Sequence, residues 1–335
     1  MTLIRPTAEA AGDGGSARLR GTGRAVAVLV VVTLGTLVPL LGPSAALHDT
    51  GEAPAPGTAG IALLRTVLFA ALCVPVGELF VARLARRVPE APGERPRSWA
   101  AYAAGAGFAA ALGLASVVAT GNLVPHGLGQ IDVGGLYSTR DGKLALLEVN
   151  AFLLAGLCAV SGRPGRQVWP LTAVVVAEAL RAHPVTEHSP PVGSALTLVH
   201  LTCAALWVGG LLCVLRTIGR WRGGAAGTAL LGRYARVAVV LLAAITASGV
   251  FSSLRRMPAD TILDQLTTTA YGRALLAKVL LVAVAALLAL WARMRLARAA
   301  DPLTACSPAR AEVVLLGLAV TVSGLLTALP LPIRW

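Results

Sequence analysis

The residues of this sequence that are best suited to chemistry are three histidines in one region. His183 and His188 flank the short segment HPVTEH, and His200 lies in the apolar run that follows it. Imidazole is a ligand for copper, zinc, iron and nickel. Because a short loop joins the segments that carry them, these three side chains can converge. We therefore predict a metal site made of His183, His188 and His200.

The run that carries His200 has further side chains at helical spacing. His200, Cys203 and Trp207 follow one another at i, i+3 and i+7, which places them on one face of a helix. The alternative for His200 is a structural imidazole, hydrogen-bonded to a neighbouring helix. The alternative for the two loop histidines is simple exposure to water.

The composition shows what kind of element must position these residues. Of the 335 residues, 56% are hydrophobic and 13% are charged, and the mean hydropathy is +0.73. Soluble domains carry about 25% charged residues, and about 20 consecutive apolar residues cross a membrane. The sequence predicts an all-α, polytopic transmembrane helical bundle with about eight or nine spanning helices, over residues 25–47, 59–82, 99–120, 144–161, 168–185, 193–215, 235–254, 272–291 and 311–331.

The net charge of +13 follows the predicted topology. Of the 29 Lys and Arg residues, 20 fall in one set of alternate loops and six in the other set. Cytoplasmic loops carry the excess of basic residues, so we predict a cytoplasmic N-terminus and an external C-terminus. The basic residues therefore mark topology, and the charge does not indicate a nucleic-acid partner.

The predicted spans divide the chain into segments. Residues 1–24 are expected to form a disordered cytoplasmic N-terminus, and residues 25–47 a first transmembrane helix or a signal-like segment. Residues 59–192 form the N-terminal part of the membrane bundle, and residues 193–332 form its second part. The longest external connections are predicted at 121–143 and 255–271.

Several spans contain ionisable residues, which are expensive in a membrane and therefore candidates for function. We predict a polar vestibule that ends at His200. Arg65, Glu148, Glu178 and Lys278 lie at similar depth on different helices, and Trp207 would line the path. The alternative is a set of internal ion pairs that fix helix register, since Glu178 and Arg181 can pair at i, i+3. Glu312 is expected at the cytoplasmic membrane surface.

Absent motifs limit the function. The sequence has no GxxxxGK[ST] phosphate loop, no DKTG and no HExxH. ATP-driven transport by this chain and intramembrane zinc proteolysis are not supported, and we expect a protein that is not an enzyme.

Four consecutive segments resemble the copper-resistance D (CopD) family of bacterial inner-membrane proteins. They are LVHLTCAALWVGGLLCVL at 198–215, GRYARVAVVLLAAITASGVFSSL at 232–254, TTTAYGRALLAKVLLVAVAALLALWAR at 267–293 and ARAEVVLLGLAVTVSGLLTALPLP at 309–332. GIALLRTVLFAALCVPVGELF resembles the family's arginine-bearing first helix. The resemblance makes 193–332 a copper-resistance D-like membrane domain, and it implies that recurrent polar positions of the family fall at Arg65, His183, His200, Tyr271, Gly272, Arg273, Lys278 and Glu312.

The resemblance implies a multi-pass protein of the bacterial cytoplasmic (inner) membrane that admits copper without its own ATPase. The family is associated with CopC, a periplasmic copper-binding β-domain. Only about 11 residues separate the first two predicted helices, so a CopC-like partner would be a separate protein. One alternative is a haem-binding redox protein in which His126 or His183 faces His200. Another is an assembly factor for respiratory copper enzymes.

Overall fold

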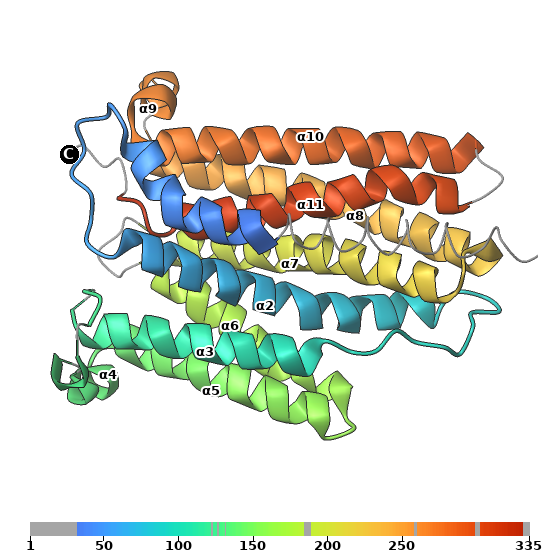
Figure 1. The fold of residues 1–335 in the computed structure, drawn as a ribbon, viewed down its shortest axis with the longest axis horizontal. Helices are drawn as coiled ribbons and strands as arrows, with labels where there is room; N and C mark the ends of the chain where they lie inside the picture. Colours follow the sequence, from blue (N-terminus) through green and yellow to red (C-terminus); the bar gives the residue numbers. More distant parts are fainter. Residues whose placement is uncertain are drawn as a thin grey trace, which may run out of the picture.

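The regular structure of this protein is helical. The computed structural model describes residues 32–121, 123–125, 127–130, 132–183, 189–257, 260–298 and 302–330. Within these ranges every regular element is a helix, and no strand occurs. The long helices lie side by side in one bundle (Figure 1). The prediction of an all-α helical bundle is confirmed.

Seven helices within the described ranges are long and apolar enough to cross a membrane. They are α2 (Thr58–Ala85), α3 (Ala100–Ala119), α5 (Arg140–Val160), α7 (Pro190–Arg220), α8 (Gly224–Arg256), α10 (Ala270–Arg298) and α11 (Pro302–Leu326). The shorter elements are the apolar helix Val32–Leu47, α4 (Val133–Ser138), α6 (Val168–Arg181), α9 (Ile262–Thr268), and the 3-10 helices η1 (Leu128–Gln130) and η2 (Pro164–Gln167).

The predicted count of eight or nine spanning helices is not confirmed, because one predicted span is shorter than expected and another is described only in part. α6 has 14 residues, so it rises roughly 21 Å, whereas the hydrocarbon core is about 30 Å thick. The first predicted span is described only as Val32–Leu47. The predicted disordered segment 1–24 lies outside the described residues.

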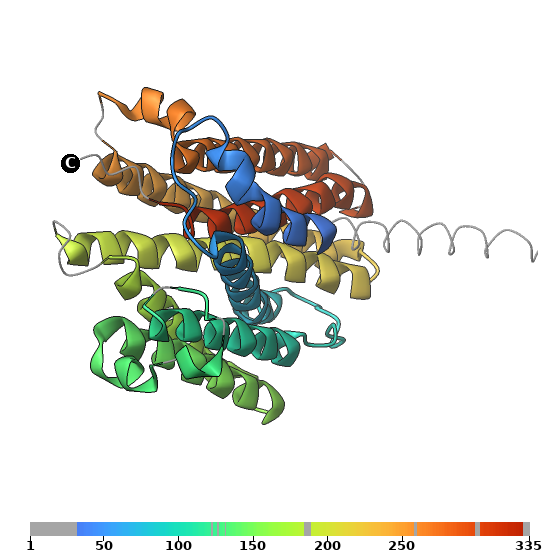
Figure 2. The same ribbon diagram turned by 60° about the vertical axis from the view of Figure 1, so that its left-hand side comes forward.

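We call the end of the bundle where the short helix α9 lies the α9 end, and the other end the opposite end. The α9 end includes the starts of α2, α5, α7 and α10, and the last residues of α6 and α8. Both α4 and α9 lie at this end (Figures 1 and 2). These two short helices fall within the long connections predicted at 121–143 and 255–271.

Small residues set the closest helix crossing of the bundle. A Cβ atom added to Gly77 on α2 would lie 2.1 Å from the backbone carbon of Gly209 on α7, and one added to Gly209 would lie 1.8 Å from the Cys73 carbonyl oxygen. Close backbone approach through small residues is how membrane helices pack, because lipid tails provide no hydrophobic drive for their association. The crossing fixes α7, which carries His200, against α2, which carries Arg65.

Candidate functional site

A cavity among six helices is large enough to hold a small ligand. Its volume is about 400 Å³, and α2, α6, α7, α8, α10 and α11 all contribute to its wall. Small-molecule pockets have volumes of about 300–1,000 Å³. The ionisable and aromatic polar residues of the wall are Arg65, Glu178, Arg181, His200, Trp207, Arg256, Tyr271 and Lys278. We call this space the cavity below.

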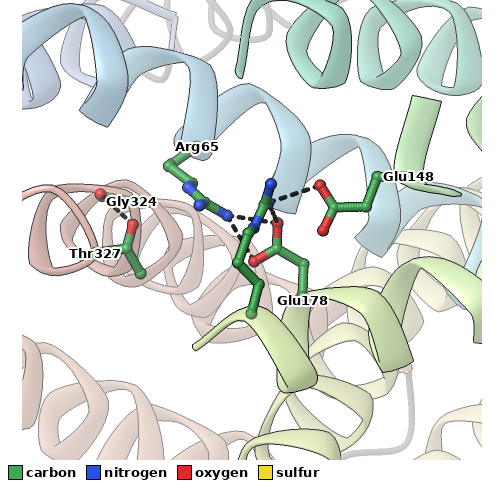
Figure 3. Close-up of polar contacts among 6 residues, drawn as sticks. Arg65, Glu148, Glu178, Gly324 and Thr327 are labelled. Carbon is green, nitrogen blue, oxygen red and sulfur yellow. Dashed lines mark hydrogen bonds and ion pairs between the residues drawn. The ribbon is translucent and has the colours of Figure 1, made fainter. Parts of the chain in front are cut away.

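Four charged residues on one side of the bundle form a connected ion-pair network. Arg65 Nη1 lies 2.5 and 2.6 Å from the two carboxylate oxygens of Glu178. Arg181 Nη2 lies 2.6 Å from Glu148 Oε2 and 2.6 Å from Glu178 Oε1. Figure 3 shows Arg65, Glu148 and Glu178 pointing toward one another from different helices. We call Arg65, Glu148, Glu178 and Arg181 the charge network.

The charge network is neutral overall and buried. Glu148 is 0% exposed and Glu178 is 5% exposed. Two guanidinium groups face two carboxylates, which offsets the cost of burying each charge. Arg65 Nε, Arg181 Nε and Arg181 Nη1 have no hydrogen-bond partner among the described residues. The network therefore joins α2, α5 and α6 while keeping donor capacity beside the cavity.

The other side of the cavity carries two cations without a carboxylate partner among the described residues. Lys278 on α10 makes no ion pair or hydrogen bond there. Arg256, the last residue of α8, donates from Nη1 to the Tyr271 hydroxyl at 3.1 Å. Because the charge network is neutral, Lys278 and Arg256 make the cavity cationic.

The two described histidines of the predicted metal site lie on neighbouring elements. His200 lines the cavity, and its Nδ1 lies 3.1 Å from the Ser248 hydroxyl on α8. His183 is 2% exposed, and its Nε2 lies 2.8 Å from the Thr197 hydroxyl on α7. Each ring is therefore held by a hydroxyl of α7 or α8. His188 and His126 lie outside the described residues.

Trp207 connects the cavity wall to a buried carboxylate. Its indole Nε1 donates to Glu312 Oε1 at 3.2 Å, and the Tyr234 hydroxyl donates to the Trp207 carbonyl at 2.7 Å. Glu312 is only 4% exposed. The expectation of Glu312 at the cytoplasmic membrane surface stays a prediction, and within the bundle this carboxylate is buried against Trp207.

Four of the five predicted vestibule residues meet at the cavity. Arg65, Glu178, Trp207 and Lys278 line it, whereas Glu148 lies behind the wall, bonded to Arg181. In the described part of the chain, no group of three or more His, Cys, Asp or Glu side chains is placed to hold a metal. The predicted trio of His183, His188 and His200 stays a prediction, because His188 is not described. No observation supports haem.

Sequence reasoning missed the part that Arg256 plays in the wall. It had counted this residue only as a basic loop residue that reports topology. The signal available in the sequence was the position of Arg256 and Tyr271 near the two ends of the predicted connection 255–271. Such a connection brings the ends of its two helices to the same side of the membrane. Spacing alone does not show that these two side chains bond.

The comparisons with known proteins agree with the sequence resemblance. Residues 228–326 match the family model "Copper resistance protein D". This segment covers α8, α9, α10 and most of α11, so it includes Arg256, Tyr271, Lys278 and Glu312. Neither the curated proteins nor the solved structures gave a match. This membrane protein is therefore similar to the copper resistance protein D (CopD) family over residues 228–326.

Proposed function

We propose that this protein admits copper ions across the bacterial cytoplasmic membrane through the cavity, and that it does so without an ATPase of its own. The observation that carries the proposal is the position of His200. This imidazole lines the cavity together with residues of the CopD-matched helices α8, α10 and α11. In this proposal His183, His188 and His200 are the copper ligands.

The hydrogen bonds of the histidines support their role as ligands. A hydrogen bond to one ring nitrogen orients the imidazole, as is typical of histidines that bind metals. His200 is held in this way by Ser248, and His183 by Thr197. The loop that carries His188 would bring the third imidazole.

The proposal orients the α9 end toward the outside. The predicted cytoplasmic arginines of the described helices lie at the opposite end, at Arg83, Arg86 and Arg87 on and after α2, Arg216 and Arg220 on α7, and Arg293 and Arg295 on α10. The positive-inside rule supports this orientation. Copper would then enter at the end where His183 and the cavity lie, delivered directly or by a separate CopC-like protein.

Within this proposal the remaining groups shape the path. The charge network holds α2, α5 and α6 together beside the cavity, and Trp207 lines the inner wall. The positive charge of Lys278 and Arg256 opposes a bare copper ion. A copper path therefore needs imidazole ligands, whose bonds to the metal are coordinative rather than purely coulombic.

The experiment is copper accumulation in cells that express His200→Ala. We expect uptake to fall roughly tenfold or more. Loss of a residue that only hydrogen-bonds a metal ligand already costs about 10–100-fold in affinity or activity, and loss of a ligand should cost at least as much. His48→Ala is the matched control, since the His48 side chain is 77% exposed and lies away from the cavity. Uptake by His200→Ala equal to that of the control, at equal protein level, would refute the proposal.

A further inference from the structure

We propose that the cavity is a binding site for a small oxyanion, a carboxylate or phosphate group, held by Lys278, Arg256 and Tyr271. The inference goes beyond copper transport and does not rest on it. It comes from the charge balance of the cavity wall and from the donors that face it.

The charge balance singles out two of the four cations in the wall. Arg65 and Arg181 are each bonded to carboxylates of the charge network, at 2.5 to 2.6 Å. Arg256 bonds a neutral hydroxyl, and Lys278 bonds no described residue. Among the described residues that line the cavity, Glu178 is the only carboxylate, and both arginines of the network already occupy it. Within this part of the chain, two positive charges are left without a counter-charge.

The depth of Lys278 makes this imbalance costly. Lys278 lies eight residues beyond the start of α10, which is roughly 12 Å along the helix. A charged side chain within a membrane-spanning helix costs several kcal/mol unless it is paired or faces water. The charge of Arg256 also acts on Lys278, and two like charges raise that cost further. An anion between them removes both penalties.

The donors on α10 lie on one face. Tyr271, Leu275, Lys278 and Val282 recur at i, i+4, i+7 and i+11, and all four line the cavity. The Tyr271 hydroxyl accepts from Arg256, so its own proton remains to be donated. Arg256 keeps further N–H groups besides Nη1, and the Lys278 ammonium has three. This set offers donors and positive charge but no acceptor other than the hydroxyl, which fits an oxyanion.

The rest of the wall limits the size of the ligand. Apolar residues such as Leu72, Leu275 and Leu316 complete the cavity, and its volume is about 400 Å³. A small mono- or dicarboxylate or a phosphate fits this space with water. If the proposed copper activity also holds, a bound anion would lower the repulsion that copper meets before it reaches His200.

The test is calorimetric titration of the detergent-purified, copper-free protein with succinate and, separately, with inorganic phosphate. We expect saturable binding of at least one of them, and the anion that binds more tightly identifies the ligand as carboxylate or phosphate. Lys278→Gln and Arg256→Gln should each weaken binding about tenfold, as expected when a charge-assisted hydrogen bond is lost. Lys143→Gln and Arg255→Gln, both exposed and outside the cavity wall, should bind like wild type.

Tyr271→Phe gives an independent variant that keeps the charge and the ring. It should weaken binding by a few-fold, since it removes one neutral hydrogen bond. The proposal is overturned if neither anion binds wild type, or if Lys278→Gln and Arg256→Gln bind as tightly as their controls. Because copper is absent from the titration, these outcomes leave the result of the His200→Ala uptake experiment independent.

Discussion

At the scale of single residues, the charged groups of the cavity wall are of two kinds: those paired in the charge network, and two cations that have no carboxylate partner among the described residues. Arg181 joins the two carboxylates, and Glu148 is fully buried behind it. The predicted alternative of internal ion pairs thus describes these contacts, while Lys278 and Arg256 remain outside them. Removing the central guanidinium is the direct way to test how much the network stabilises the fold.

We predict that Arg181→Met lowers the free energy of unfolding by about 3–5 kcal/mol, because it leaves a buried carboxylate without its partner. The measurement is denaturation of the detergent-purified protein. Arg166→Met, at an exposed position before α6, should change the same quantity by less than about 0.5 kcal/mol.

A double variant separates the ion pair from the side chain itself. Arg181→Met combined with Glu148→Leu removes both the cation and the carboxylate that Arg181 alone holds at 2.6 Å. It should be less destabilised than Arg181→Met, because no unpaired charge stays at position 148. A double variant at least as unstable as the single one would show that packing, rather than charge, is what Arg181 contributes.

At the scale of elements, the crossing of α2 and α7 brings the cavity walls together. Gly77 and Gly209 allow the two backbones to touch at that point, and Pro75 lies in the same turn of α2. The crossing determines how Phe69 and Cys73 of α2 face Ala205 and Val208 of α7 in the cavity wall. The packing of both helices therefore depends on two positions without a side chain.

We predict that Gly209→Ala destabilises the protein by about 1–3 kcal/mol, because overpacking forces the helices apart. Its Cβ atom would lie 1.8 Å from the Cys73 carbonyl oxygen. Gly219→Ala is the matched control in the same helix, where an added Cβ meets nothing within 4 Å. That variant should gain up to about 1 kcal/mol from helix propensity. Equal effects at both positions would contradict the proposed crossing constraint.

At the scale of the whole molecule, the orientation decides which compartment the cavity serves. The α9 end carries the cavity-lining residues Arg256 and Tyr271, and the opposite end carries most arginines of the described helices. The proposed orientation places the α9 end outside. The two ends can be distinguished by chemical labelling, because each has exposed positions that lie outside the spanning helices or in short ones.

We predict that a membrane-impermeant maleimide labels Asp264→Cys in intact cells and labels Arg163→Cys only after permeabilisation. Asp264 lies on α9, and Arg163 lies between α5 and η2; both are exposed. The background is a variant in which all five native cysteines are replaced. Labelling of Arg163→Cys but not Asp264→Cys in intact cells would reverse the orientation and with it the proposed direction of copper entry.

Local properties of the sequence determined the helices and the family. Spans of apolar residues predicted the seven described helices that are long and apolar enough to cross a membrane. Such spans form helices because backbone groups in a membrane must be hydrogen-bonded within each helix. The ordered segments that carry Tyr271, Lys278 and Glu312 predicted the CopD family, which the match over 228–326 confirms. His200 and most of the vestibule residues were identified as candidates because ionisable groups are rare in such spans.

Only the tertiary structure decided which of those residues meet. Arg65, Glu178 and Lys278 share similar depth in sequence, yet two of them pair, while the third meets no carboxylate among the described residues. Pairing depends on how each helix is rotated and how closely it approaches its neighbours. That rotation is set by packing contacts such as Gly77 against Gly209, which involve none of the charged side chains. Depth along a helix is a property of the sequence, whereas direction around the helix axis becomes meaningful only when the neighbouring helices are in place.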